Sequence, residues 1–133
     1  MAKIPEKLRL DMADDPYYYR CSRNDLLHDH VCKPNPMTGQ RIEWEHAMIY
    51  ANNQIQRMWA IIPLCWWAHS GPGMVKEINH WIALNRGTDE DLMEYPRANF
   101  IHMRARLNKI YKAVEAPISN MVEDEYLPTI NYD

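Results

Sequence analysis

The pattern of hydrophobic and polar positions predicts a β-hairpin followed by a helix at the centre of the chain. Residues 41–46 alternate between the two classes, as the residues of a half-buried strand do. Side chains of a regular strand point to opposite faces in turn, so Ile42 and Trp44 share one face and Glu43 and Glu45 the other. His46 is therefore directed with the apolar residues unless the strand ends or bulges at this point.

The next residues predict a connection, a second strand and a helix. Residues 47–56 are rich in side-chain amides and are expected to form the connection. Residues 57–63 predict the return strand, with Pro63 at its end because proline has no backbone N–H to donate. A helix is expected from Leu64 to His69, before the break at Gly71-Pro72-Gly73.

Three further helices are predicted after the break. Residues 74–85 form an amphipathic helix, and Gly87 is expected to end it in the left-handed conformation. Thr88 begins a T-x-x-D signature, which predicts a short helix over residues 89–94. Pro96 is expected at the first position of the longest helix. The apolar stripe of that helix is Phe100, Met103, Leu107, Ile110, Tyr111 and Val114.

The residues before the hairpin are less regular. Residues 1–16 fit a short extended arm and a helical turn equally well, and residues 33–40 predict a loop. Residues 25–32, if extended, place His28, His30 and Cys32 on one face. We therefore expect an α+β fold with one domain over residues 20–116, an N-terminal arm at 1–19 and a C-terminal tail at 117–133.

Composition and charge narrow the class of protein. The 133 residues are 47% hydrophobic and 25% charged, which is ordinary for a globular domain. No apolar run is long enough to span a bilayer and the N-terminus has no apolar signal segment, so we expect a cytoplasmic protein without a membrane partner. The net charge of −3 counts against a dedicated DNA binder but allows an enzyme with a local basic patch. Three cysteines, an odd number, predict reduced thiols or metal ligands.

The order and spacing of Glu45-His46 and Leu64-Cys65-x-x-x-His69 resemble the HNH nucleases, also called ββα-metal or His-Me finger enzymes, and in particular their small phage-type members. The resemblance covers roughly residues 20–85 and is strongest over 41–69. It implies a ββα-metal hairpin–helix core wrapped by additional helices. It also implies a metal-dependent endonuclease that hydrolyses DNA, with Glu45 and His69 as ligands of Mg²⁺ or Mn²⁺ and His46 as the general base.

The chemistry suits those residue types. Hydrolysis of a phosphodiester needs an activated nucleophile and relief of the negative charge that builds up on the phosphate. An imidazole with an ordinary pKa of about 6.5 can accept a proton near neutral pH. One carboxylate and one imidazole leave most positions of a divalent cation open to water and phosphate oxygens.

The chain departs from the family pattern in the Cys-x-x-Cys pairs that hold a structural zinc in many members. Cys21-x-x-Asn24 and Cys65-x-x-Ala68 each lack the second cysteine. Either the core is zinc-free, with Trp66, Trp67 and Trp81 packing in place of the metal, or a rewired zinc site exists. The donors for a rewired site would be Cys21, His28, His30, Cys32 and Cys65.

A second departure is the central asparagine, because Ala60 stands where the family pattern has it. The nearest substitutes are Asn52 and Asn53, and Gln56 or a backbone carbonyl could orient His46 instead. Arg41, Arg57 and Arg104 are candidates for phosphate contacts with DNA. The basic residues of the last helix fit a solvated face as well as a phosphate-contacting one.

Two alternatives to a nuclease stay open. The first is a non-catalytic treble-clef-like module that binds nucleic acid or a protein. The second is an interaction domain stabilised by zinc.

Overall fold

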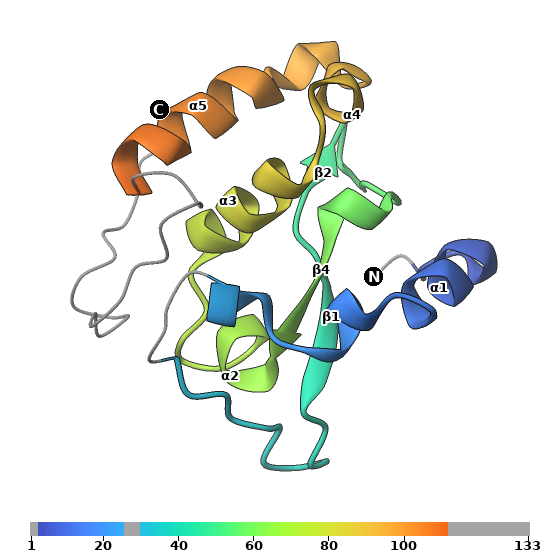
Figure 1. Cartoon of the computed structure of the whole chain (residues 1–133), viewed down its shortest axis with the longest axis vertical. Helices are drawn as coiled ribbons and strands as arrows, with labels where there is room; N and C mark the ends of the chain where they lie inside the picture. The colour runs from blue at the N-terminus through green and yellow to red at the C-terminus, as the bar shows by residue number, and fades with distance from the viewer. Residues whose placement is uncertain (1–2, 26–29, 112–133) are drawn as a thin grey trace.

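The computed structural model describes residues 3–25 and 30–111, and it has a mixed α+β fold (Figure 1). Two small antiparallel sheets are surrounded by helices, as the sequence predicts for the fold class. The α-helices are α1 (Glu6–Ala13), α2 (Trp66–His69), α3 (Lys76–Arg86), α4 (Asp89–Met93) and α5 (Phe100–Tyr111). The strands are β1 (Ile42–His46), β2 (Ile49–Tyr50), β3 (Asn53–Gln54) and β4 (Ile61–Cys65). Short 3-10 turns cover Pro16–Tyr19, Ser22–Asp25, Met58–Ala60 and Pro96–Ala98.

Strands β1 and β4 form the central antiparallel pair, and α2 follows β4 directly. Ile42 pairs with Cys65 and His46 with Ile61, so the register is regular to the end of β1. The prediction of the second strand at residues 57–63 is wrong by several residues, because Met58–Ala60 form a 3-10 turn and the strand continues through Pro63 to Cys65. The helix correspondingly begins at Trp66 rather than Leu64.

The predicted connection at residues 47–56 contains a second, smaller hairpin. β2 and β3 pair through Ile49 with Gln54 and Tyr50 with Asn53. The two turn residues between them, Ala51 and Asn52, have φ angles of 51° and 66°. This left-handed geometry matches the natural twist of a tight hairpin.

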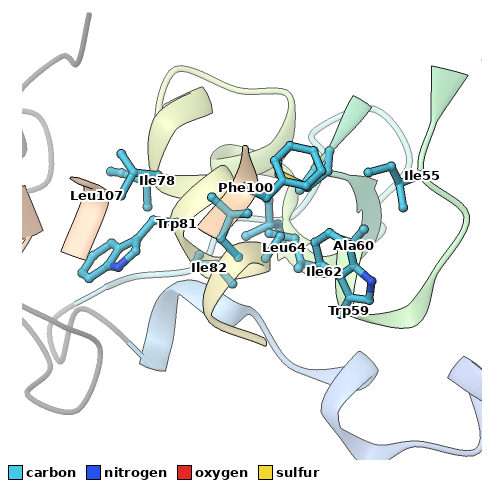
Figure 2. Packing of buried hydrophobic residues seen from close by; sticks show 14 of the residues in the cluster. Ile55, Trp59, Ala60, Ile62, Leu64, Ile78, Trp81, Ile82, Phe100 and Leu107 are labelled. Carbon is cyan, nitrogen blue, oxygen red and sulfur yellow. The ribbon is translucent and has the colours of Figure 1, made fainter. Parts of the chain in front are cut away.

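The main core lies between β4, α3 and α5 (Figure 2). Trp81 of α3 stacks on Tyr111 of α5 with ring centroids 4.7 Å apart, and its indole N–H donates to Asn108 Oδ1 at 2.8 Å. Trp81 therefore joins the two long helices. The labelled members of the core in Figure 2 are Ile55, Trp59, Ala60, Ile62, Leu64, Ile78, Trp81, Ile82, Phe100 and Leu107.

Two predictions about helix ends in this region need correction. Gly87 does follow α3, but its φ of −70° is not left-handed. Glycine suits the position because a Cβ there would lie 3.0 Å from Leu92 Cδ2 and 3.1 Å from the Trp59 ring. Pro96 begins a 3-10 turn rather than the longest helix, since Asn99 has a left-handed φ of 55° and α5 starts at Phe100.

The T-x-x-D signature at Thr88 gives the expected capping box. Thr88 Oγ1 accepts from the Asp91 N–H at 3.1 Å, and Asp91 Oδ2 accepts from the Thr88 N–H at 3.0 Å. The helix that it caps is α4, which ends at Met93.

The N-terminal segment forms helix α1 and packs on the second face of the central strand pair. Met12, Tyr18 and Ile61 are fully buried together, and Trp44 of β1 donates its indole N–H to the Tyr18 carbonyl at 3.0 Å. Arg86 of α3 secures this contact, because its Nη1 donates to Tyr18 Oη at 2.8 Å and to the Met58 and Ile61 carbonyls at 2.9 and 3.0 Å. The arm predicted at residues 1–19 thus includes residues that are part of the packed fold.

Among the described residues, no helix is both long and apolar enough to cross a bilayer. The predicted tail at residues 117–133 and the predicted ligand His28 lie outside the described part of the chain.

Candidate functional site

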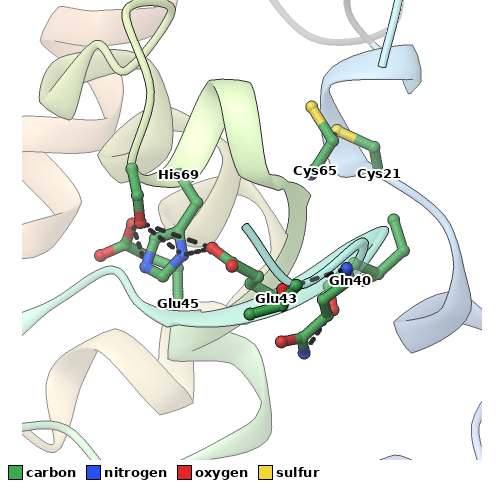
Figure 3. Close-up of polar contacts among 9 residues, drawn as sticks. Cys21, Gln40, Glu43, Glu45, Cys65 and His69 are labelled. Atoms are coloured by element: carbon green, nitrogen blue, oxygen red, sulfur yellow. Dashed lines mark hydrogen bonds and ion pairs between the residues drawn. The ribbon is translucent and has the colours of Figure 1, made fainter. Parts of the chain in front are cut away.

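Glu43, Glu45 and His69 come together where α2 crosses the carboxylate face of β1 (Figure 3). His69 Nδ1 lies 2.6 Å from Glu43 Oε1, and His69 Nε2 lies 3.3 Å from Glu45 Oε2. Strand alternation puts both carboxylates on one face, and the short helix after β4 places the imidazole between them. The structure therefore brings together Glu45 and His69, which the sequence pairs as metal ligands, and adds Glu43.

The contacts of His69 determine what its second nitrogen can do. A carboxylate only accepts hydrogen bonds, so His69 Nδ1–H donates to Glu43. In the neutral imidazole, Nε2 then carries a lone pair that faces the Glu45 carboxylate. Two electron-rich atoms at this distance repel each other unless a proton or a cation lies between them.

Glu45 is held in a partly dehydrated environment. Burial raises the pKa of its carboxyl group, a charged His69 opposes this effect, and the neighbouring Glu43 raises the pKa further. The side chains of Glu45 and His69 are 23% and 22% exposed, so both remain reachable from solvent. A positive ligand at this point would relieve the cost of keeping Glu45 ionised.

His46 is the last residue of β1, and the strand ends there without a bulge. Its Nε2 lies 2.9 Å from Gln56 Oε1, while the Gln56 amide nitrogen donates to the Lys3 carbonyl at 3.3 Å. The second contact fixes the amide with its oxygen toward His46, so Nε2–H of His46 is the donor. His46 Nδ1 is then the ring atom that can accept a proton.

A pocket of about 250 Å³ connects these residues. Glu45, His46 and His69 all line it. The register of β1 is regular through His46 and no bulge re-aims this residue, so strand alternation directs its side chain to the face of Ile42 and Trp44, opposite to that of Glu45. Asn79 of α3 also lines the pocket; it is 3% exposed, and its Oδ1 has no hydrogen-bond partner among the described residues. A buried carbonyl oxygen without a hydrogen-bond partner costs free energy of folding.

A second cluster contains three cysteines and one histidine, and it could hold a metal ion such as zinc. Suitable ligand atoms of Cys21, His30, Cys32 and Cys65 all lie within 4.8 Å of one another. His30 Nε2 is 3.5 Å from both Cys21 Sγ and Cys65 Sγ. Sulfur and nitrogen ligands at their usual distances from a tetrahedral zinc lie about 3.6 Å apart, so the spacing fits.

The surroundings of this cluster support the same conclusion. The pKa of Cys65 is lowered to about 3, chiefly because the Cys21 thiol hydrogen-bonds to it, and His30 lowers it further against the effect of burial. The same hydrogen bond and burial raise the pKa of Cys21. The Cys65 N–H donates to Cys21 Sγ at 3.3 Å, and the Asn24 amide donates to Cys32 Sγ at 3.7 Å. Such N–H···S contacts orient sulfur ligands around a metal.

The remaining cysteines of the two incomplete Cys-x-x-Cys pairs both belong to this cluster. Cys21 and Cys65 lie together beside the strand pair (Figure 3), and His30 and Cys32 complete a group of four. Trp81 packs between α3 and α5, and Trp67 lies 6.1 Å from His30 between ring centroids.

The arginines predicted to contact phosphates and the asparagines predicted to orient His46 do not line the pocket of Glu45, His46 and His69. Arg57 pairs with Glu94 at 3.4 Å, Arg104 pairs with Asp89, and Arg41 is exposed before β1. Asn52 and Asn53 are exposed at the β2–β3 hairpin, where the Asn53 amide donates to the Ala51 carbonyl at 3.1 Å. Gln56, named from the sequence as a substitute, is the side chain that contacts His46.

Two residues of the site were not predicted from the sequence. The signal for Glu43 was present, because alternation puts it beside Glu45. Asn79 interrupts the apolar face of α3 next to Ile78 and Ile82, and a polar amide at such a position is a signal for a buried polar contact.

Comparisons with known protein families, with curated proteins and with solved structures found no match to this chain.

Proposed function

We propose that this protein is a metal-dependent endonuclease of the HNH type that hydrolyses phosphodiester bonds in DNA. The observation that carries the proposal is the approach of Glu45 Oε2 to His69 Nε2 at 3.3 Å, with His46 lining the same pocket. The antiparallel pair β1–β4 followed by α2 supports a ββα-metal core.

The donor set fits a divalent cation such as Mg²⁺ or Mn²⁺. Neighbouring ligands of an octahedral ion, each about 2.1 Å from it, lie about 3.0 Å apart, close to the Glu45–His69 distance. Asn79 also lines this pocket, and Glu43 holds the His69 ring by its other nitrogen. When bound, the cation neutralises charge that develops on the phosphate.

His46 is the general base of the proposed reaction. Gln56 holds its Nε2–H, so Nδ1 accepts the proton of the water molecule that attacks the phosphorus. The proton leaves on the imidazole, and the resulting positive charge stays hydrogen-bonded to the Gln56 carbonyl oxygen. Gln56 thus does the positioning that the central asparagine does in the family.

The Cys/His cluster has a structural part in this proposal. It joins the segment before β1 to the end of β4, immediately before α2. Zinc held by Cys21, His30, Cys32 and Cys65 would fix the position of α2, and hence of His69, relative to β1.

Nicking of supercoiled plasmid DNA tests the proposal. We expect activity that depends on added Mg²⁺ or Mn²⁺ and falls on the order of a hundredfold in Glu45→Gln. Glu90→Gln, which removes an exposed carboxylate from α4, is the control and is expected to behave as wild type. Wild-type protein with no metal-dependent nicking, or Glu45→Gln as active as wild type, would contradict the proposal.

A second candidate function is favoured by the Cys/His cluster alone. In this case the chain is a non-catalytic, zinc-stabilised module that binds nucleic acid or a protein. Protein that carries one zinc ion, binds its partner and never nicks DNA under any divalent cation would select this function over the nuclease.

A further inference from the structure

A second pocket, of about 310 Å³, lies between α3 and α5 beside the candidate site. Among the described residues that line it, two are cationic, two are histidines and none is a carboxylate. They are Lys76, His80, Ala98, Asn99, His102, Met103 and Arg106. This is a local concentration of positive charge and N–H donors in a chain whose net charge is −3.

The position of these side chains on the helices adds to their effect. Lys76 is the first residue of α3, and Asn99 directly precedes α5. The first turn of a helix has unpaired N–H groups and a partial positive charge, both of which favour an anion. Lys76 also lies close enough to His80 for its charge, after burial, to contribute to lowering the pKa of His80 to about 4.

The pocket shares lining residues with two neighbouring pockets. It shares Lys76 and His80 with the pocket that holds Glu45, His46 and His69. On the other side it shares Ala98 and Met103 with a third pocket, of about 450 Å³, lined by Tyr50 and Arg97 among others. Three adjoining pockets suit a polymer with repeated phosphates better than a single small anion.

We propose that the α3–α5 pocket binds backbone phosphates of the DNA substrate next to the bond that is cut. This assignment rests on the proposed function, because it takes the pocket of Glu45 and His69 as the cleavage site. Lys76 and Arg106 supply the charge, and His80, Asn99 and His102 supply hydrogen bonds to phosphate oxygens.

Fluorescence anisotropy with a labelled duplex DNA, without added divalent cation, tests the assignment separately from cleavage. Lys76→Gln combined with Arg106→Gln is expected to weaken binding roughly tenfold and to reduce the salt slope of log Kd by about two, one for each lost phosphate contact. Lys76→Arg combined with Arg106→Lys keeps both charges and is expected to bind close to wild type. Thermal melting of each variant shows that it is folded.

The matched control removes the same charge from α1, which lies away from α5 (Figure 1), through Lys7→Gln and Arg9→Gln. Equal loss of binding in both double variants, or an unchanged salt slope in the pocket variant, would overturn the assignment. Plasmid nicking by the same proteins separates the two proposals. If DNA binding depends on Lys76 and Arg106 but the protein does not nick DNA, the nuclease proposal is excluded and the pocket assignment stands. If the protein nicks DNA equally well without these two residues, the pocket assignment alone is excluded.

Discussion

At the scale of single residues, His69 is the centre of the site because both of its ring nitrogens face a carboxylate. Glu43 holds Nδ1 at 2.6 Å, which leaves Nε2 directed at Glu45. Asn79 adds a buried oxygen without a partner.

Asn79→Leu is expected to have opposite effects on the stability of the fold and on cation binding. Loss of an unpartnered buried oxygen should raise the free energy of unfolding by about 1 kcal/mol, because the folded state no longer bears the cost of dehydrating that oxygen. The same substitution should weaken Mn²⁺ binding about tenfold, as measured by calorimetric titration. Asn79→Asp, which keeps an oxygen in place, should bind Mn²⁺ at least as well as wild type. Unchanged affinity in Asn79→Leu would exclude Asn79 from the cation site.

Glu43→Gln tests the orientation of the imidazole. The amide can present its NH₂ group to Nδ1, so the variant no longer fixes which ring nitrogen carries the proton. We expect Mn²⁺ affinity to fall by about tenfold to a hundredfold, the usual effect of losing a partner behind a metal ligand. Glu90→Gln serves again as the control, and equal affinities in the two variants would show that Glu43 has no such role.

At the level of helices and strands, the sequence predicted the elements that have an alternating pattern or a capping signature. It did not locate the ends of a strand that is buried on both faces. β1 and the capping box at Thr88 were found, because one is half-buried and the other has a local chemical signal. All five residues of β4 are buried, with Ile61 in the cluster around Tyr18 and Ile62 and Leu64 in the main core. A strand covered on both faces does not alternate, so the pattern could not locate its ends.

The site followed the same logic. Glu45 and His69 were paired through their resemblance to the HNH pattern, and Glu43 shares a face with Glu45 by alternation alone. Asn79 could not be assigned, since its place in the pocket depends on how α3 packs across the strand pair. The choice of His30 and Cys32 among the candidate zinc donors depends in the same way on the path of the loop back to α2, where the Trp67 N–H donates to the Lys33 carbonyl at 3.3 Å.

Arg86→Met tests how α3 holds the N-terminal segment. The variant removes three charge-assisted hydrogen bonds to Tyr18, Met58 and Ile61 while keeping an apolar side chain. The Ile61 carbonyl and the Tyr18 hydroxyl lose this donor, whereas the Met58 carbonyl still accepts from Tyr18 Oη, so the free energy of unfolding should fall by about 2 kcal/mol in urea denaturation. Arg9→Met, at an exposed position of α1, should change it by less than about 0.5 kcal/mol. A similar small change in Arg86→Met would mean that the segment docks without this residue.

At the scale of the whole molecule, two candidate centres lie on either side of the β4–α2 junction. Cys65 ends β4 in one centre, and His69 ends α2 in the other. A metal bound by the cysteines would therefore fix the segment that carries a ligand of the other site. Stability and activity are expected to depend on different ions.

Removal of zinc tests this division. We expect purified protein to contain one zinc ion per chain, and a strong chelator to lower the melting temperature in a way that Zn²⁺, but not Mg²⁺, restores. His30→Ala should lose the zinc and melt lower, whereas His102→Ala, an exposed histidine on α5, should keep both properties. Metal-free protein that melts as wild type does would show that the four donors hold no structural metal.

In the proposed reaction, His46 removes a proton from water beside a cation held by Glu45 and His69. The most direct measurement compares wild type with His46→Ala for the plasmid nicking rate at saturating Mn²⁺ and for Mn²⁺ affinity in the same preparations. We predict unchanged affinity and a nicking rate lower by about a hundredfold or more, as expected for loss of a general base. A variant that nicks as fast as wild type, or a wild type that does not nick at all, would contradict the claim.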